Sequence, residues 1–176
     1  MLSAWKQIIP KLEKKVELVF LGKIKGIYGK RIVHAFQNLQ SNRVTFKSYL
    51  TRVQQLEFNN VMGNTDLLVS PIILNTRYKI YREKYGFTKI AGIETDVIRY
   101  GIPAIIPSGY PLDKNLRQVI DGYDTPEGLS ELLLKYINGD LLNEAKDNAA
   151  KVVKVYKAEK VRRGLISFFE NNLGET

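Results

Sequence analysis

The stretch from Glu83 to Pro107, EKYGFTKIAGIETDVIRYGIPAIIP, decides the fold of this chain. It opens with a turn that carries glycine and threonine, residues 85–89, and continues into a helical run at about residues 90–100. Apolar residues recur in that run at the spacing of one helix face, which predicts a helix with one side in a core. Gly101-Ile102-Pro103 ends the helix, because glycine favours a left-handed cap and proline cannot continue the helical backbone. An apolar strand, residues 104–106, follows.

Apolar runs and helical patterns alternate upstream of this stretch. Residues 66–70, closed by Pro71, predict a buried strand, so the central unit is strand, long polar loop, helix and strand. Before it we expect a helix at 3–14, strands at 16–21 and 44–46, and helices at 31–39 and 53–62. Strands separated by helices are typical of a parallel sheet that helices cover on both faces. The sequence therefore predicts an α/β fold, a doubly wound, Rossmann-like and mostly parallel sheet of about five strands.

Composition limits the class of protein. The chain has 176 residues, 44% of them hydrophobic, which is ample for the core of one domain. It has no cysteine and one histidine, which excludes thiolate metal sites and Cys-His nucleophile pairs. No apolar stretch is long enough to span a membrane and the first residues do not resemble a signal peptide, so we expect a cytoplasmic location. The formal charge of +9 favours anionic partners without choosing among nucleotides, nucleic acids and anionic lipids.

The start of the predicted helix at residue 90 is a candidate phosphate site. Backbone N–H groups of Ile90, Ala91 and Gly92 would point outward there, and the helix dipole favours negative charge. Thr88 adds a hydroxyl and Lys89 a compact positive charge. The same residues also fit a helix cap followed by solvated charges, and the chemistry alone leaves both interpretations open.

Two carboxylates follow about one helical turn later. Glu94 and Asp96 are candidates to accept hydrogen bonds from the vicinal hydroxyls of a ribose. Asp96 shares a helix face with Gly92, whereas Glu94 points elsewhere. The sequence thus predicts a diphosphate at the helix start and a ribose beside Asp96 or Glu94.

Several motifs in a fixed order resemble a known family. They are the strand DLLVSP at 66–71, the turn Gly86-Phe87-Thr88, the acidic residue Glu94 or Asp96, the run Gly101-Ile102-Pro103, and Leu116 to Ile120. This order resembles the C-terminal, nucleotide-sugar-binding half of retaining glycosyltransferases with the GT-B fold, the glycosyl transferases group 1 type. The similarity spans roughly residues 15–138.

The resemblance implies roles for individual residues. Gly86 and Phe87 would face the sugar. The family has two glutamates eight positions apart, and alignment on Gly101-x-Pro103 puts Thr88 and Asp96 at those positions. Glu83 and Glu94 are candidates for the catalytic position, but they lie eleven residues apart and fit only if the loop carries an insertion. The catalytic residue therefore stays unassigned.

The resemblance also implies how the domain works. Residues 1–176 would be a single domain, the donor-binding half of a two-domain enzyme, with a C-terminal helical extension at 140–176. It would bind a nucleotide-sugar without a metal or other cofactor. Hexosyl transfer would need the missing N-terminal acceptor-binding domain, so the chain alone would be inactive. The donor half of the family opens with a strand, whereas this chain begins with a helix, so we expect its sheet to lack a central strand.

Other functions stay open. A non-enzymatic α/β interaction or regulatory domain would explain the fold, and it predicts a collapsed loop at residues 85–92. A basic nucleic-acid-binding protein would explain the charge, and it predicts a continuous basic stripe and salt-sensitive binding. Under the donor-binding interpretation no nucleic acid is expected, and contact with an anionic membrane surface would give a membrane-peripheral location.

Overall fold

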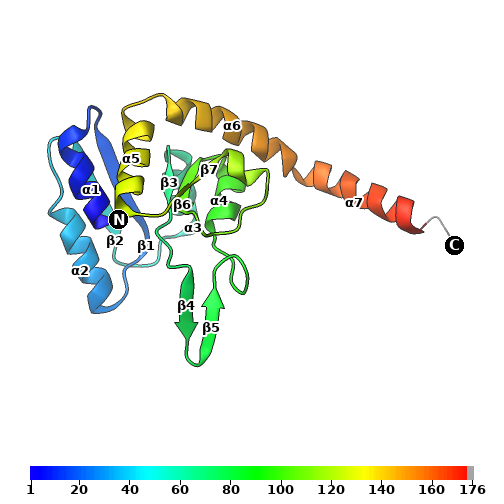
Figure 1. The fold of residues 1–176 in the computed structure, drawn as a ribbon, viewed down its shortest axis with the longest axis horizontal. Helices are drawn as coiled ribbons and strands as arrows, with labels where there is room; N and C mark the ends of the chain where they lie inside the picture. Colours follow the sequence, from blue (N-terminus) through cyan, green and yellow to red (C-terminus); the bar gives the residue numbers. More distant parts are fainter. Residues whose placement is uncertain (174–176) are drawn as a thin grey trace.

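A computed structural model describes residues 1–173, apart from the side chains of residues 78, 158–160 and 170–173. Figure 1 shows helices and strands that alternate along the chain. The helices are α1 (Leu2–Ile8), α2 (Gly26–Gln37), α3 (Gln55–Gly63), α4 (Ile93–Tyr100), α5 (Pro126–Ile137), α6 (Leu141–Val155) and α7 (Ala158–Leu173), with short 3-10 helices η1 (Ile9–Lys11) and η2 (Leu116–Gln118). The strands are β1 (Val16–Lys23), β2 (Val44–Tyr49), β3 (Leu68–Val69), β4 (Asn75–Tyr78), β5 (Tyr81–Lys84), β6 (Ala104–Pro107) and β7 (Ile120–Tyr123).

The main strands form parallel sheets flanked by helices, as the sequence predicts. β1 pairs with β2, and β6 lies between β3 and β7. All of these pairs are parallel, and the connections between them contain helices, which is the pattern of a Rossmann-like α/β fold. The five strands do not form one continuous sheet, however, because β1 and β3 are not paired with each other.

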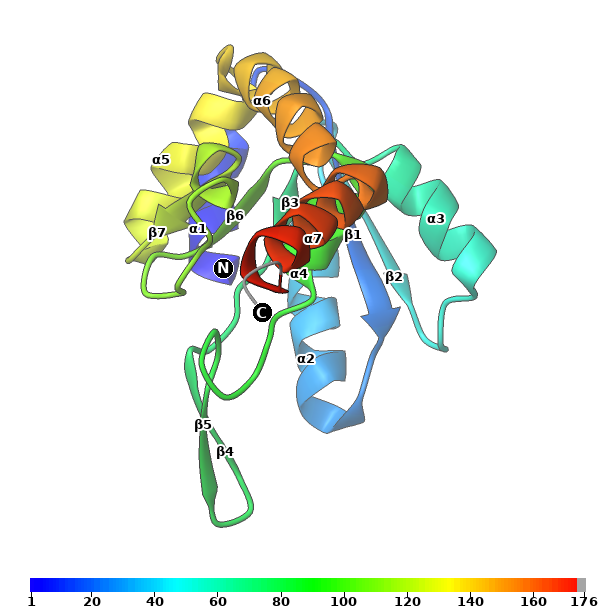
Figure 2. The same ribbon diagram turned by 90° about the vertical axis from the view of Figure 1, so that its right-hand side faces the viewer.

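Two apolar cores lie on the sheets. The first joins α1 and α5 to β1, β2 and α2, and includes Trp5, Ile8, Phe36 and Leu133. The second joins α4, α6 and η2 to β6 and β7, and includes Val97, Ile106 and Val152. Helical spacing therefore predicted that Ile93 and Val97 of α4 are buried, but it was wrong for Ile90, which lies before the helix and is 79% exposed. Figure 2 shows α1 and α5 together on one side of the molecule and α3 on the other.

Part of the predicted long polar loop after Pro71, residues 75–84, is instead an antiparallel hairpin. Asn75 pairs with Lys84 and Tyr78 with Tyr81, and Lys79 takes a positive φ of 55° in the turn. The period-two pattern of the hairpin was hidden because charged and aromatic residues fill both of its faces. Figure 1 shows the hairpin extending away from the sheets.

Three further boundaries differ from the sequence analysis. Helix α4 begins at Ile93 rather than near residue 90, because residues 85–92 form a turn and a short irregular segment. Residues 120–123 form strand β7, which was not predicted because Asp121 and Gly122 weaken its apolar pattern. The predicted C-terminal helical extension is two helices, because it breaks after Val155 and α7 begins at Ala158.

Helix α5 begins with the cap that the sequence Thr125-Pro126 favours. Thr125 is the N-cap residue, and its Oγ1 accepts a hydrogen bond of 3.1 Å from the backbone N–H of Gly128. Pro126 occupies the first turn, where its missing N–H has no cost.

The predicted extension at 140–176 corresponds to α6 and α7, and residues 174–176 lie outside the described part of the chain. α6 packs against α4 and α5, whereas α7 points away from the sheets in Figure 1. Among the described side chains of α7, several apolar ones are exposed, including Leu165, Phe168 and Phe169. Within the described residues, no helix is both long and apolar enough to cross a membrane.

Candidate functional site

The loops that follow β5 and β6 meet at the carboxyl ends of the parallel strands. A Cβ built on Gly86 would lie 2.3 Å from Cδ of Pro111, so the two loops approach as closely as backbone allows. Gly86 also has a φ of +84°, which side-chain-bearing residues rarely adopt. Ligands of parallel α/β sheets bind at this edge, beyond the carboxyl ends of the strands. The predicted turn thus lies where a ligand site is expected.

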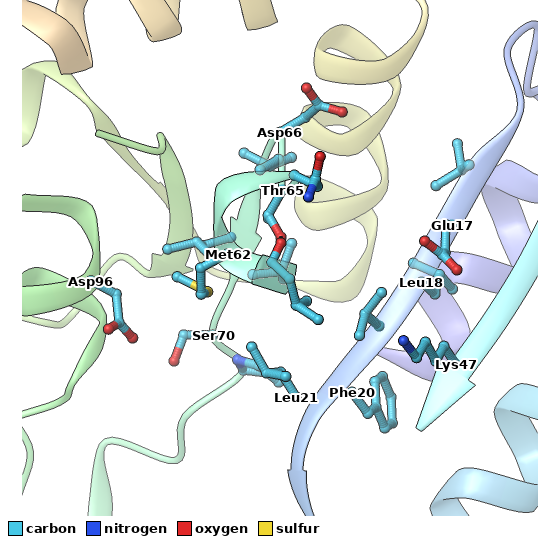
Figure 3. A pocket seen from close by; sticks show the side chains of 18 of the residues that line it. Glu17, Leu18, Phe20, Leu21, Lys47, Met62, Thr65, Asp66, Ser70 and Asp96 are labelled. Atoms are coloured by element: carbon cyan, nitrogen blue, oxygen red, sulfur yellow. The ribbon is translucent and has the colours of Figure 1, made fainter. Parts of the chain in front are cut away.

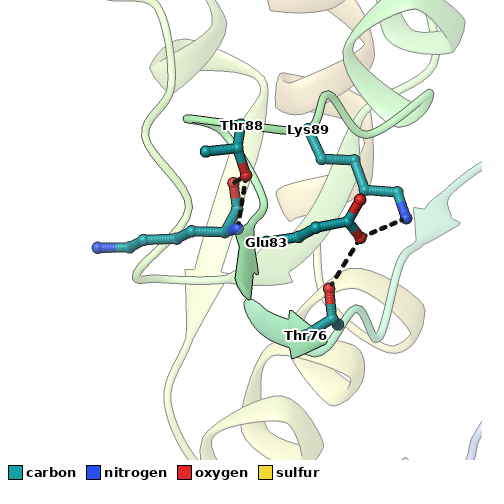
Figure 4. A network of polar contacts seen from close by, with 5 residues as sticks. Thr76, Glu83, Thr88 and Lys89 are labelled. Atoms are coloured by element: carbon teal, nitrogen blue, oxygen red, sulfur yellow. Dashed lines mark hydrogen bonds and ion pairs between the residues drawn. The ribbon is translucent and has the colours of Figure 1, made fainter. Parts of the chain in front are cut away.

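The side chain of Lys89 belongs to a polar network at the base of the hairpin (Figure 4). Its Nζ lies 3.1 Å from Oε2 of Glu83, and Oγ1 of Thr76 donates to the same oxygen at 3.5 Å. The hydrogen bond to Glu83 and its negative charge raise the pKa of Lys89 above the ordinary value. Lys89 also lies over the ring of Tyr85, 5.2 Å from its centroid. The charge of Lys89 is therefore partly balanced within the protein.

Thr88 closes the turn rather than pointing at a ligand site. The backbone N–H of Lys84 donates to Oγ1 of Thr88 at 2.8 Å, and the backbone N–H of Thr88 donates to the carbonyl of Lys84 at 2.9 Å. Side-chain bonds of this kind stabilise turns locally. In Figure 4 Thr88 and Lys89 lie on different sides of the turn.

Tyr110 connects the two loops, because its hydroxyl is hydrogen-bonded to both Ala91 and Glu94. The Tyr110 hydroxyl donates to Oε2 of Glu94 at 2.6 Å and accepts from the backbone N–H of Ala91 at 3.3 Å. Burial, followed by the hydrogen bond to Glu94, raises the pKa of Tyr110. The N–H of Ala91 and one oxygen of Glu94 are thus already paired inside the protein. Sequence reasoning missed Tyr110, although an aromatic residue between Gly109 and Pro111 in a loop that leaves a strand was a usable signal.

Asp96 faces a different space, a cavity of about 1610 Å³. The cavity is lined at this end by Asp96, Gly92 and Ser70, and Figure 3 shows the side chains of Asp96 and Ser70 among those around it. Among the described residues, no hydrogen-bond partner of the Asp96 carboxylate is seen. Burial raises its pKa, against a smaller opposing effect of Arg99. Asp96 is therefore a partly buried carboxylate with acceptor capacity to spare.

The predicted site residues fall into three groups. Gly92 and Asp96 line the cavity. Glu83, Thr88 and Lys89 form or close the turn beside the hairpin, and Ala91 and Glu94 are held by Tyr110. The sequence spacing predicted that these residues lie near one another, but it did not predict that they divide into three groups. It also did not identify Ser70, which lines the cavity, or Thr76, which bonds to Glu83.

The remaining predicted residues lie on the surface of the turn. Phe87 is 66% exposed and Ile90 79% exposed. The Nζ of Lys84 lies 4.4 Å from the centroid of the Phe87 ring. Part of the loop at 85–92 is therefore exposed, whereas Ala91 is 4% exposed and Gly86 packs against Pro111. Among the side chains that the structure describes, no group of three or more histidine and acidic residues is arranged to hold a metal ion.

Parallel sheets with helices on both faces and loops that converge at the carboxyl edge define a Rossmann-like α/β domain. The fold was also compared with those of solved structures. A crystal structure of a glycosyltransferase from Rickettsia africae ESF-5 matches 99% of this chain with a TM-score of 0.56 and 13% sequence identity. The chain spans 44% of the length of that protein. The fold is thus glycosyltransferase-like.

Comparisons based on sequence found no related protein or family. No protein-family model matches the chain, and no curated protein matches it.

Proposed function

We propose that this domain binds the nucleoside diphosphate of a nucleotide-sugar, as the C-terminal donor-binding domain of a GT-B glycosyltransferase. The observation that carries the proposal is Asp96: a partly buried carboxylate without a described hydrogen-bond partner, facing a cavity one turn from the start of α4. A carboxylate in this position can accept hydrogen bonds from the two vicinal hydroxyl groups of a ribose. The glycosyltransferase-like fold supports the same class of ligand.

The contacts favour Asp96 over Glu94 as the ribose ligand. Glu94 already accepts a short hydrogen bond from Tyr110, whereas Asp96 keeps its oxygens for a ligand. The diphosphate would then meet the N-terminus of α4, where Gly92 is exposed and lines the same cavity. Because the Ala91 N–H is bonded to Tyr110, the phosphate contacts shift from residues 90–92 towards Gly92 and Ile93.

Lys89 and the turn before it complete the proposed site. Lys89 is exposed and would exchange part of its contact with Glu83 for a phosphate oxygen. The sugar would lie towards Gly86 and Phe87. Hexosyl transfer would need an acceptor-binding domain, so donor binding without transfer is expected of this chain. A cytoplasmic location, with contact to an anionic membrane surface, and binding without a metal also belong to this proposal.

Calorimetry with UDP-, GDP- and ADP-sugars, with and without a divalent cation, tests the proposal. One of these donors should bind the parent protein with micromolar to millimolar affinity. Asp96→Asn should weaken that binding by about 1 to 2 kcal/mol, and Lys89→Ala by a similar amount, if each makes a charge-assisted contact. Glu94→Gln is the matched control on the same helix and should have little effect. Failure of every nucleotide to bind a folded protein, or equal effects of the Asp96 and Glu94 variants, would contradict the assignment.

The pH dependence of donor binding gives a second test of the proposed role of Asp96. Burial raises its pKa, so its carboxylate takes up a proton at a higher pH than an ordinary aspartate does. Donor binding should therefore weaken as the pH falls through that raised pKa. In Asp96→Asn this acid limb should disappear.

A further inference from the structure

The hairpin of β4 and β5 extends from the carboxyl edge of the sheets without packing on either core. Figures 1 and 2 both show its turn clear of the other elements. No described side chain from 75 to 84 belongs to the two apolar cores, and the two strands pack mainly against each other. An isolated two-stranded hairpin is marginally stable in water, so a surface that covers it would stabilise it.

One face of the hairpin is basic. Arg77 lies directly opposite Arg82 in the antiparallel register, and Lys84, two residues after Arg82, points to the same side. We call these three residues the basic face. All three are exposed, and none forms an ion pair with an acidic side chain that the structure describes. Like charges directly opposite each other destabilise a strand pair, so this face gains stability from an anionic partner.

The acidic residue of the hairpin, Glu83, does not balance the basic face. It is paired with Thr76 in the register, so it points to the other side of the hairpin. There its Oε2 lies 3.1 Å from Nζ of Lys89 and accepts a hydrogen bond of 3.5 Å from Thr76 (Figure 4). The positive charge of the basic face therefore remains available to a partner.

The turn of the hairpin adds apolar surface. Ile80 is 75% exposed and Tyr81 is 67% exposed. Apolar side chains that gather on an exposed surface mark an interaction site, and tyrosine is enriched at the interface between membrane and water. An isoleucine at the tip gains little from the phosphates of a nucleic acid, whereas acyl chains remove it from water. The combination of cations with this tip thus favours a lipid surface.

A second basic and apolar segment faces the same way. Helix α2 begins on the side of the molecule towards which the hairpin points, as Figures 1 and 2 show. Its first turn exposes Ile27 and Tyr28, between the exposed Lys25 and Lys30. The sequence from 18 to 56 contains no acidic residue. Two such segments, far apart in the sequence, fit a broad anionic surface better than a single small ligand.

We propose that the hairpin docks this edge of the domain on an anionic lipid surface. The guanidinium groups of Arg77 and Arg82 bind lipid phosphates, and Lys84 adds a further cation. Ile80 and Tyr81 enter the layer between the headgroups and the acyl chains. The inference rests on the membrane contact included in the proposed function and names the element that makes it. Its test uses no nucleotide, so its failure is distinguishable from a failure of donor binding.

Co-sedimentation of the full chain with lipid vesicles tests the proposal. The parent should bind vesicles of mixed phosphatidylcholine and phosphatidylserine and should bind pure phosphatidylcholine far less. The double variant Arg77→Gln, Arg82→Gln should weaken binding to the anionic vesicles by about tenfold or more, and Ile80→Ser by about fivefold. Neither change reaches a core, so circular dichroism and thermal unfolding should match the parent.

Two variants outside the hairpin serve as controls. Lys151→Gln with Lys154→Gln removes the same charge from exposed positions of α6 and should weaken binding by about twofold at most. Phe168→Ser with Phe169→Ser removes apolar surface from α7, the competing exposed element, and should leave vesicle binding unchanged.

The following outcomes would overturn the proposal. The parent does not bind anionic vesicles, the α6 control weakens binding as much as the arginine variant does, or the α7 variant alone loses binding. Single-stranded DNA that binds in place of vesicles, and is released by the arginine variant, would assign the hairpin to a nucleic acid instead.

A tryptophan at the tip reports directly where the hairpin lies. The chain has one tryptophan, Trp5, which is buried. With Tyr81→Trp, emission should shift to shorter wavelength and become protected from an aqueous quencher when anionic vesicles are added. Unchanged emission of this variant in its vesicle-bound form would show that the tip stays in water and would refute the proposal.

Discussion

The two parallel sheets each contain a strand with an apolar run, β6 and β1, but these strands have different surroundings. β6, with the sequence AIIP, lies between β3 and β7 and is buried under α4 and α6. β1, with the sequence VELVFLGK, has a neighbour on one side only, and each of its apolar residues keeps part of its surface exposed. The difference shows that an apolar run predicts a strand, but the number of strands beside it decides how much of that run is buried.

The loops at the carboxyl ends of the two sheets differ in the same way. Beyond β5 and β6, Gly86 contacts Pro111 and Tyr110 bonds to both Ala91 and Glu94. Where β1 ends and α2 begins, a Cβ on Gly22, inside the strand, or on Gly26, the first residue of α2, would meet nothing within 4 Å. The loops beyond β5 and β6 are therefore packed against each other, whereas the backbone at Gly22 and Gly26 has space beside it.

The largest expected effect separates the central strand β6 from β1, which has a paired strand on one side only. Ile105→Ala in β6 removes a fully buried side chain and should lower the free energy of unfolding by about 2 to 5 kcal/mol. Leu18→Ala in β1 should cost clearly less, because Leu18 is only partly buried beside the cavity. Urea unfolding of both variants measures the difference. Equal losses would mean that β1 is as enclosed as β6.

A pair of glycine substitutions tests how tightly the loop at Gly86 is packed. Gly86→Ala forces a positive φ on alanine and a clash with Pro111, so we expect a loss of about 1 to 3 kcal/mol. Gly22→Ala meets no neighbour and should stay within about 0.5 kcal/mol of the parent. Thermal unfolding compares them. A well-tolerated alanine at position 86 would show that the two loops are not packed together in solution.

A tyrosine pair tests a polar contact between α5 and β7. Tyr136 is 2% exposed, and its hydroxyl donates to Oδ2 of Asp121 at 2.8 Å, which joins α5 to β7. Tyr136→Phe should therefore cost about 1 to 2 kcal/mol. Tyr28 in α2 is 78% exposed, and Tyr28→Phe should be neutral. Chemical denaturation of the two variants decides whether the contact stabilises the fold.

The smallest expected effect depends on pH. The Tyr156 hydroxyl donates to Oδ1 of Asp113 at 2.7 Å, and this bond, with the backbone N–H of Asn115, lowers the pKa of Asp113. A lowered folded-state pKa contributes stability above about pH 4, and that contribution is lost as the pH falls through the lowered value.

Tyr156→Phe should thus reduce the midpoint of thermal unfolding slightly at neutral pH and less in acid. The matched control, Glu57→Gln, breaks a surface ion pair of 3.9 Å with Lys47 of β2 and should change nothing measurable. A shift that grows towards acid pH would contradict the assigned contact.

Local sequence patterns determined the elements whose signals are local. The cap formed by Thr125, the left-handed Gly101 that ends α4, and the apolar faces of the helices all depend on residues a few positions apart. The sequence therefore predicted the α/β class and the central strands correctly. It also placed the candidate carboxylates, Glu94 and Asp96, on one short helix.

Only the tertiary structure decided which of these residues share an environment. Tyr110 lies sixteen residues from Glu94 and nineteen from Ala91, yet it bonds to both, and Asp96 faces a cavity whose other wall is β1. The sequence pattern of β1 shows an apolar strand, but its open edge follows from the spatial order of the strands. Hydrogen bonds and burial depend on neighbours in space, and periodicity along the chain reports only neighbours along one element.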